Sequence, residues 1–292
     1  MNILTFDIEE WYIEKIFKGD DPKKYQAYDD VLHRILDLLE THQTKATFFC
    51  LGGMAEHFPT IVKLIADRGH EVGCHSNTHR WINKMTPDEF KEDTARAITL
   101  LEDCCGKKVK SYRAPAFSIG ENNKWAFEIL AECGIENDAS IFPGTRDFGG
   151  FPAFSGGGKP CIIDHNGLCI NEFPITLTRL PILDKEIGYS GGGYFRIMPL
   201  SFVESVMRES DYTMCYFHVL DLLDFKSKLM TKEEYERYFK ERGTLIKRII
   251  RYSKSNLGRK RTFKGLQHLL ETFDFHPIEE AASSSILPKI SL

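Results

Sequence analysis

The feature that most constrains the fold is the alternation of short apolar runs with segments of helical periodicity. Residues 3–6, 46–49 and 214–217 form largely apolar runs of the length of a buried strand. Between them, apolar residues recur at helical spacing over residues 31–39 and 61–65. Strands that alternate with helices predict an α/β fold with a parallel sheet, either closed into a (β/α) barrel or open and doubly wound.

Capping and helix-breaking residues place some of the boundaries. Residues 86–89 read Thr-Pro-Asp-Glu, a capping box with proline at the first helical position, and predict a helix through about Leu101. Pro199 similarly predicts a helix through about Arg208. Residues 143–195 are rich in Gly and Pro, so we expect long loops and irregular strands laid over the core.

The length of 292 residues suits one large domain. We expect this domain over residues 1–285, with a helical C-terminal part over residues 231–275 and a tail over residues 286–292. The helical part carries many Lys and Arg residues. We expect a solvated helical face there, with contact to an acidic polymer as the alternative.

Overall charge and hydrophobicity limit the partners. The formal net charge of −4 gives no reason to expect nucleic acid or an anionic membrane as a partner. No segment approaches the roughly 20 apolar residues of a membrane span. The first residues lack the basic region and the apolar stretch of a signal peptide, so we expect a cytoplasmic protein. The oligomeric state is unknown.

Polar residues follow four of the apolar runs, at the point where each predicted strand ends. They are Asp7 and Glu9, His75 and His79, Arg113, and His218. In barrels and in open α/β sheets, active sites are built at the carboxyl edge of the strands. The convergence of four separate segments at that edge is a stronger signal than any single motif.

The His75-x3-His79 spacing is compatible with a metal site. Two imidazoles four residues apart lie on one face of a helix or can converge from a loop, and both arrangements suit Zn²⁺ or a similar ion. Asp7 and Glu9 point the same way in an extended chain. One of them could complete the metal site while the other takes a proton from water, and the alternative is two surface acids.

Two further side chains have roles compatible with this site. Arg113 lies before Ala114-Pro115 and could hold a carboxylate in a bidentate grip, although a surface arginine is the simpler interpretation. His218 ends an apolar run and suits the protonation of a leaving amine. A histidine on such a strand is otherwise a core residue with satisfied hydrogen bonds.

These segments, in this order, resemble the polysaccharide deacetylase family, also called the NodB-homology group or carbohydrate esterase family 4. The similarity is greater to a branch found with exopolysaccharide and capsule biosynthesis. It covers residues 1 to about 280. The matching segments are Thr5-Phe6-Asp7-Ile8-Glu9-Glu10-Trp11, Ala46-Thr47-Phe48-Phe49, His75-Ser76-x-x-His79, Arg113-x-Pro115, Ser190-Gly191-Gly192-Gly193-Tyr194-Phe195-Arg196 and Phe217-His218.

The resemblance implies a distorted (β/α) barrel of about seven strands. It also implies a divalent metal, with zinc expected and cobalt, nickel or manganese as alternatives. Its substrate would be a carbohydrate that bears N-acetyl groups. The implied roles are metal ligand for Glu9, His75 and His79, catalytic base for Asp7, tether of that base for Arg113, catalytic acid for His218, oxyanion binding for the backbone near Ala116, and support of the catalytic histidine for Asp138.

The chain departs from the commoner family pattern at two positions. Much of the family has Asp-Asp in the first segment, whereas Ile8 here makes Glu9 the expected ligand. Many members have an aromatic residue where this chain has Ala116. Trp11 and Tyr194 could stack on a sugar or belong to the core.

We therefore expect a hydrolase that removes an N-acetyl group from an amino sugar. The substrate would be a polysaccharide, an oligosaccharide or a biosynthetic intermediate. One alternative is an amidohydrolase of the same fold that acts on a small non-sugar amide or cyclic imide. The other is a non-catalytic sugar-binding relative.

Overall fold

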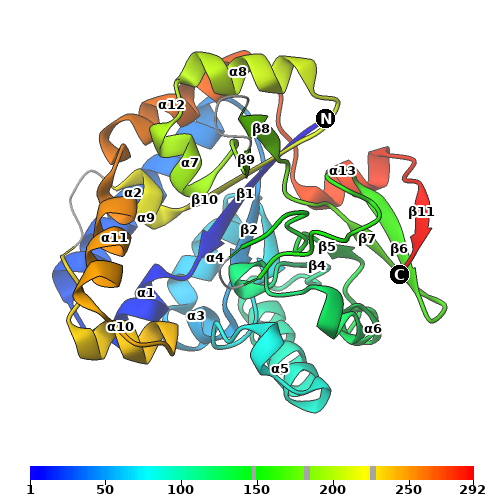
Figure 1. Ribbon diagram of the computed structural model, residues 1–292, viewed down its shortest axis with the longest axis horizontal. Helices are drawn as coiled ribbons and strands as arrows, with labels where there is room; N and C mark the ends of the chain where they lie inside the picture. The colour runs from blue at the N-terminus through cyan, green and yellow to red at the C-terminus, as the bar shows by residue number, and fades with distance from the viewer. Residues whose placement is uncertain (147–148, 181–184, 224–227) are drawn as a thin grey trace.

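A curved nine-stranded sheet forms the centre of the protein. The computed structural model describes residues 1–146, 149–180, 185–223 and 228–292 (Figure 1). The strand order is β10-β1-β2-β3-β4-β5-β7-β6-β11. The strands are β1 (Asn2–Ile8), β2 (Thr47–Cys50), β3 (Glu71–Cys74), β4 (Ser111–Tyr112), β5 (Asn137–Asp138), β6 (Cys161–His165), β7 (Leu168–Glu172), β10 (Thr213–His218) and β11 (Lys289–Ser291).

The predicted α/β fold with a parallel sheet is confirmed. Seven neighbouring strands, from β10 to β7 in the sheet order, pair in parallel, in agreement with the expected strand number. An antiparallel β6–β7 pair and the short strand β11 extend this run. Along the described strands the pairing ends at β10 on one side and at β11 on the other, so the barrel is not closed by hydrogen bonds.

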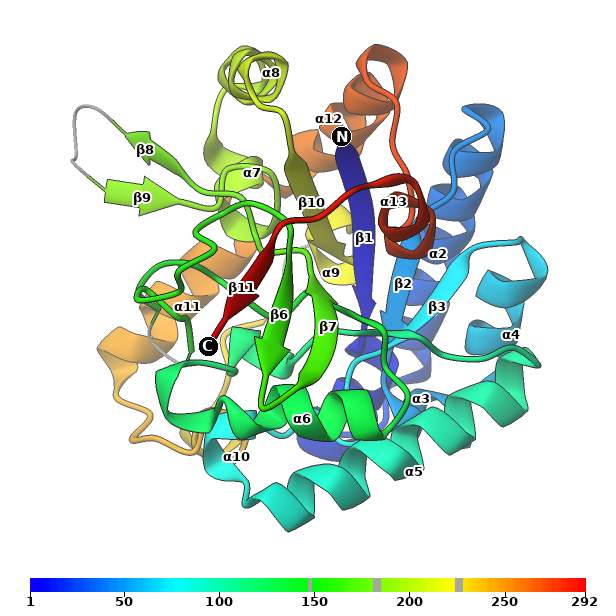
Figure 2. The ribbon, with the colours of Figure 1, turned by 90° about the vertical axis from the view of Figure 1, so that its right-hand side faces the viewer.

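Helices surround the sheet, from α8 and α12 on one side to α5 and α6 on the other (Figures 1 and 2). The longer ones are α2 (Pro22–Thr41), α4 (Pro59–Asp67), α5 (Pro87–Cys105), α6 (Trp125–Glu132), α8 (Leu200–Glu209), α10 (Lys232–Phe239), α11 (Leu245–Asn256) and α12 (Arg259–Thr272). The shorter ones are α1 (Glu10–Ile13), α3 (Gly52–His57), α7 (Gly192–Ile197), α9 (Val219–Leu222) and α13 (Ile278–Ser284). Among the described residues, no helix has both the length and the hydrophobicity to cross a membrane.

Local sequence signals explain where helix α5 begins and ends. The Thr86 hydroxyl accepts a hydrogen bond from the Glu89 N–H, and the Glu89 carboxylate accepts one from the Thr86 N–H, so the predicted capping box is confirmed. The helix continues four residues past the expected end at Leu101 and ends at Gly106, whose φ of 69° is left-handed. Glycine suits this position because it has no Cβ to clash there.

The region expected to form loops over the core contains more regular structure than predicted. Strands β6 and β7 form a hairpin of the main sheet. The hairpin turns at Asn166-Gly167, where both residues have positive φ, a sequence typical of tight β-hairpins. Strands β8 (Thr178–Leu180) and β9 (Lys185–Ile187) form a separate antiparallel pair.

Strand β1 divides its side chains between two apolar clusters. Leu4, Phe6 and Ile8 belong to the larger cluster, which also contains the buried sides of helices such as α2 and α5. Ile3 belongs to a smaller cluster with residues of the other strands and of α13. Because strand side chains alternate, Asp7 is on the same side as Ile3. This alternation directs the carboxylate of Asp7 to the inside of the curved sheet.

Candidate active site

Three side chains from two strand ends converge as a candidate metal site. Glu9 follows β1, and His75 and His79 follow β3. One ligand atom from each of the three lies within 4.8 Å of the others. Glu9 Oε2 is 2.6 Å from His79 Nε2 and 3.6 Å from His75 Nε2. The structure therefore brings together the two histidines and the carboxylate expected from the sequence.

The chemistry of this cluster fits a divalent ion. The Nδ1 atom of His75 lies 2.8 Å from the Arg113 carbonyl oxygen. A carbonyl only accepts hydrogen bonds, so Nδ1 carries the proton and Nε2 presents a lone pair to Glu9. The Glu9 Oε2 atom is buried and lacks a hydrogen bond of good geometry despite the short distance to His79. The imidazole nitrogen of His75 and the Glu9 carboxylate thus face each other as electron-pair donors with no proton between them. Such an arrangement is stable when a metal ion lies between the donors.

The Glu9 carboxyl is held in its ionised form. Burial favours the neutral carboxyl, but positive charge at His79, in the place where an ion would otherwise lie, outweighs burial and holds the pKa of Glu9 well below its usual range. An ionised carboxylate with two imidazoles is a ligand set of catalytic zinc sites, which keep a position open for water or substrate.

The segment from His75 to His79 is a loop, which settles a question that the sequence left open. Ser76 and His79 both have positive φ, and the His79 N–H donates to the Ser76 hydroxyl at 3.0 Å. Asp93 of α5 accepts hydrogen bonds from the Asn77 N–H at 2.7 Å and from the Thr78 hydroxyl. Asp93 thus anchors the histidine loop to a helix, a role that the sequence did not indicate.

Asp7 lies beside this cluster and is paired with Arg113. The Arg113 Nη1 atom is 2.9 Å from Asp7 Oδ1 and donates a second hydrogen bond, of 2.8 Å, to the Thr5 hydroxyl. The guanidinium is fully buried and lies over the Phe49 ring. It contacts one carboxylate oxygen, whereas a bidentate grip was expected. The second oxygen, Asp7 Oδ2, is left facing His218.

His218 ends β10 and faces both acids of the β1 segment. Its Nε2 atom is 3.8 Å from Asp7 Oδ2 and 3.8 Å from Glu9 Oε1. Its Nδ1 atom is 3.2 Å from Asp221 Oδ2, and Asp221 in turn pairs with Arg196 at 2.9 Å. Burial disfavours the imidazolium, but Asp221, Glu9 and Asp7 outweigh burial and raise the pKa of His218 well above its ordinary value.

Asp221 occupies the position that the resemblance gave to Asp138, so that expectation is wrong. Asp138 instead accepts hydrogen bonds from the hydroxyl and the N–H of Ser140. It also lies opposite Glu172 in the β5–β7 pairing. The sequence did contain a signal for Asp221, because it stands three residues after His218, the spacing of a side chain that caps a helix start.

Glu10 is a buried acid that sequence reasoning did not single out. Its carboxylate accepts a hydrogen bond from the Leu220 N–H at 2.7 Å and thereby joins the β1 segment to the chain that follows His218. Burial and the charge of Glu9 raise the pKa of Glu10 to about 7. Its partner lies 210 residues away in the sequence, so no local pattern indicates the contact.

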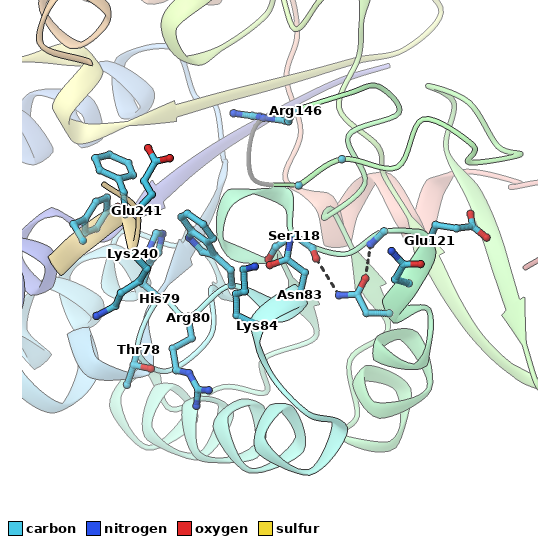
Figure 3. Close-up of a pocket in the computed structure, with 18 of the residues that line it drawn as sticks. Thr78, His79, Arg80, Asn83, Lys84, Ser118, Glu121, Arg146, Lys240 and Glu241 are labelled. Carbon is cyan, nitrogen blue, oxygen red and sulfur yellow. Dashed lines mark hydrogen bonds between the residues drawn. The ribbon is translucent and has the colours of Figure 1, made fainter. Parts of the chain in front are cut away.

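A cavity of ≈ 750 Å³ opens beside the metal cluster. His79, Thr78 and Arg80 line it, together with Ser118 and Glu121 and with residues of α10 and the loop that follows (Figure 3). The Tyr238 ring of α10 stacks on His79, with centroids 6.3 Å apart. In Figure 3, Lys240, Glu241 and His79 lie on one side of the cavity, and Ser118 and Glu121 on the other. The volume is in the range of small-molecule sites.

The three expected substrate contacts have different outcomes. Trp11 is 1% exposed, donates a hydrogen bond to Asp29 and packs edge-on against Tyr28, so it is a core residue and cannot stack on a sugar. Tyr194 is half-buried in α7 and packs against the larger apolar cluster. Ala116 follows β4 with a left-handed φ of 56°, an unusual conformation that is common at functional sites.

Comparisons with known proteins divide the chain into two matched regions. Residues 3–137 match the family model of the polysaccharide deacetylases. The N-terminal half of this chain belongs to the polysaccharide deacetylase family. Residues 139–283 match a second family model, a domain of unknown function (DUF3473). The polysaccharide deacetylase region holds Asp7, Glu9, His75, His79 and Arg113, whereas His218 belongs to the second region.

Relatives within the polysaccharide deacetylases cover only part of the chain. A peptidoglycan-N-acetylglucosamine deacetylase of Bacillus cereus is 43% identical over 96 residues, 32% of this chain and 35% of that protein. A chitooligosaccharide deacetylase of Bradyrhizobium sp. is 26% identical over 97 residues, 33% of this chain and 42% of that protein. The chain thus spans less than half the length of these relatives.

The similarity of fold extends over the whole chain. A crystal structure of a Mycobacterium smegmatis protein assigned to the polysaccharide deacetylases aligns with 100% of this chain and 93% of that one, with a TM-score of 0.63. The sequence identity is 16%, so this match supports the fold alone. It includes the region after residue 138, which supplies strand β10.

Proposed function

We propose that this protein is a metal-dependent hydrolase that removes an N-acetyl group from an amino sugar. The observation that carries the proposal is the position of His218, whose Nε2 atom lies 3.8 Å from both Asp7 and Glu9. A proton acceptor, a proton donor and a metal-ligand cluster therefore share one site. Metal-dependent hydrolysis of an amide by activated water uses all three functions.

Glu9, His75 and His79 would hold the ion, and the mixed nitrogen and oxygen donors favour zinc among the metals considered. When bound, a divalent ion supplies Lewis acidity to the amide carbonyl and to the attacking water. A site with three protein ligands leaves room for both.

Asp7 would take the proton of the attacking water. Its Oδ1 atom is occupied by Arg113, and its Oδ2 atom faces the site. The buried guanidinium keeps the carboxylate in one orientation, because it is itself held by Thr5 and by the Ala139 carbonyl oxygen. Orientation of the base within hydrogen-bonding reach of its proton is the first requirement of general base catalysis.

His218 would donate the proton that the leaving amine needs. The Asp221 carboxylate lies at Nδ1 and directs Nε2 into the site, and the raised pKa keeps the imidazolium populated near neutral pH. Water adds to the acetyl carbon, the C–N bond breaks, and the products are acetate and the free amine. One proton of the attacking water passes to Asp7, and His218 gives one proton to the amine nitrogen as the C–N bond breaks. The proton held by Asp7 then restores the imidazolium of His218, and the acetic acid formed releases its remaining proton to solvent.

The names of the relatives support an amino-sugar substrate. The two relatives named above are a peptidoglycan-N-acetylglucosamine deacetylase and a chitooligosaccharide deacetylase. We propose an N-acetylhexosamine in a polysaccharide, an oligosaccharide or a biosynthetic intermediate as the substrate. The Asp-x-Glu segment and the Ser190–Arg196 segment resemble the branch found with exopolysaccharide and capsule biosynthesis, so we propose a role in that synthesis.

We also propose that residues 1–285 act as one catalytic domain. Strand β10 pairs with β1 along six residues, and Asp7 lies opposite His218 in that register. The catalytic acid thus enters the site on a strand of the same sheet that carries the base. Neither of the two family-matched regions contains the complete site.

The test is a measurement of metal content and of acetate release. Purified protein should bind one divalent ion per chain and release acetate from N-acetylglucosamine oligomers, and Asp7→Asn should keep the ion but lose the release. Release from small amides or cyclic imides alone would favour the amidohydrolase alternative. Metal-loaded, folded protein that binds sugars and releases no acetate from a broad panel would favour the sugar-binding alternative.

A further inference from the structure

Helix α11 exposes its apolar side, which is the reverse of a helix on the surface of a soluble protein. Leu245, Ile246, Ile249 and Ile250 are 56%, 70%, 46% and 48% exposed, and the helix has no buried residue. Residues 246, 249, 250 and 253 are spaced three or four apart and share one face. Leu257, directly after the helix, is also exposed. The exposed apolar strip of α11 thus consists of Ile246, Ile249 and Ile250, with Leu245 beside it and Leu257 beyond Ser253.

Polar contacts of the opposite side hold the helix in this orientation. The Arg248 guanidinium donates a hydrogen bond to the Met230 carbonyl oxygen, and the Arg251 guanidinium lies over the Phe239 ring. Arg196 donates to the carbonyl oxygens of Lys254 and Ser255 at the helix end. Since these contacts hold the side of Arg248 and Arg251 against the protein, the apolar residues on the opposite side point outward.

The charge around this helix differs from the charge of the rest of the chain. Residues 240–264 contain ten Lys or Arg residues and one acidic residue, Glu241, although the whole chain has a formal net charge of −4. Lys254 and Lys260 are exposed. The net charge of the whole chain gave no reason to expect an anionic membrane as a partner. The acidic residues elsewhere in the chain outnumber the basic ones and so offset the positive charge of this segment in the total.

The positive charge and the exposed apolar side chains of α11 together favour one kind of binding partner over others. A second copy of the chain would bring the same basic segment against itself, and like charges repel. An acidic polysaccharide would match the charge but leave the isoleucines in water. The surface of a bilayer with anionic lipids satisfies both, because apolar side chains enter the acyl boundary while Lys and Arg contact the headgroups.

We propose that α11 binds the surface of an anionic lipid membrane. Ile246, Ile249 and Ile250 enter the boundary between headgroups and acyl chains, and the exposed Lys254 and Lys260 lie at the headgroup level. The helix lies in the plane of the membrane and does not cross it. The loop directly before α11 contributes Lys240 and Glu241 to the cavity, so the bound protein holds the cavity next to the lipid surface.

Vesicle sedimentation with the full-length protein tests this proposal. Wild-type protein should sediment with phosphatidylcholine vesicles that contain about 30% phosphatidylglycerol, and not with pure phosphatidylcholine vesicles. Ile246→Ser combined with Ile250→Ser should weaken binding at least about tenfold. Lys254→Glu combined with Lys260→Glu should weaken it by about tenfold, and added salt should do the same to the wild type.

Matched control variants show whether a loss of vesicle binding is specific to α11 or follows from any change in surface hydrophobicity or charge. Ile286→Ser removes a fully exposed isoleucine elsewhere, and Lys159→Glu reverses an exposed lysine elsewhere, so both should bind vesicles like the wild type. Circular dichroism should be unchanged in these variants, and acetate release from a soluble oligosaccharide should be unchanged in the isoleucine variant. Equal binding to both vesicle types would overturn the proposal, and so would unchanged binding of the isoleucine variant. A protein that binds no vesicles but self-associates, with the isoleucine variant losing that self-association, would overturn it as well.

Discussion

The two family-matched regions of this chain contribute to the candidate site in different ways. Residues 3–137 supply the expected metal ligands, the expected base and its arginine from the ends of three strands of the parallel sheet. Residues 139–283 supply one histidine, which reaches the site because β10 pairs with the first strand of the chain. The site residues of the first region can thus be recognised from sequence motifs. The second region contributes His218 because the sheet topology places β10 beside β1.

The difference also appears in how each region supports its residues. In the first region, the loop from His75 to His79 is anchored by Asp93, 14 to 18 residues further along the chain. In the second, His218 is supported by Asp221 and Arg196, and Arg196 is tied to the end of α11. The support of the acid therefore depends on packing among helices of the second region.

The largest expected effect follows removal of a metal ligand from the first region. His79→Ala should abolish metal binding and lower acetate release by about a thousandfold or more, because the cluster keeps only two ligands. Metal analysis and an acetate assay measure the two losses. The control is His33→Ala, which removes a histidine of helix α2 far from the cluster in the sequence. A His79→Ala protein with full metal occupancy would contradict the assignment.

Asp7→Asn should have a smaller effect of a different kind. The ligands stay in place, so metal content should be normal while kcat falls by about a hundredfold to ten-thousandfold, the usual range for loss of a general base. Burial of the unpaired Arg113 would also reduce stability, so thermal unfolding is measured in parallel. Loss of the metal in this variant would show that Asp7 is a ligand instead of a base.

In the second region, Asp221→Asn should lower kcat by about tenfold to a hundredfold with little change in KM, because Asp221 positions His218 and does not contact substrate. Asp221 raises the pKa of His218, so its loss lowers that pKa and depletes the imidazolium first at alkaline pH. The deficit should therefore be larger at pH of about 8.5 than at about 6.5. An equal deficit at all pH values would argue for a merely structural role.

The smallest effect concerns the junction between the regions, where Asp138 and Glu172 pair across β5 and β7. Burial and the charge of Asp138 raise the pKa of Glu172 well above its usual range, so Glu172 is protonated in the folded protein. A raised folded-state pKa gives stability that is present at low pH and lost as pH rises.

Glu172→Gln keeps the shape of the neutral acid and cannot ionise. Its free energy of unfolding should therefore fall less between pH of about 5 and 9 than that of the wild type, by roughly 1–3 kcal/mol. Chemical denaturation at several pH values measures this difference. Glu186→Gln, an exposed glutamate outside the junction, is the control and should follow the wild type. Parallel pH dependence of Glu172→Gln and the wild type would contradict the raised pKa of Glu172.

The sequence predicted the parts of the site that lie at strand ends. The alternation of strands and helices places Asp7, His75, Arg113 and His218 at one sheet edge before any distance is known, because parallel strands end on the same side. The resemblance then supplied their expected roles. Both depend on local pattern, which a single sequence contains.

The parts that the sequence did not predict depend on contacts between distant segments. Glu10 and Leu220 meet only in the folded chain, and so do Arg196 and Asp221. Trp11 was open to either interpretation, because an aromatic ring beside a site can face substrate or core, and only the packing of α2 decides it. The apolar face of α11 has helical periodicity, but periodicity alone does not show which side points outward.

Arg113 has a consequence for how precisely this site can be maintained. Its guanidinium holds the Asp7 carboxylate, and its own carbonyl oxygen accepts the hydrogen bond from the His75 ring. One residue is thus a common reference point for two groups with different tasks, so small thermal displacements of its strand move both in concert. The separation between base and ligand is then less sensitive to fluctuation than the position of either alone, which matters where catalysis tolerates errors of only about 0.5 Å.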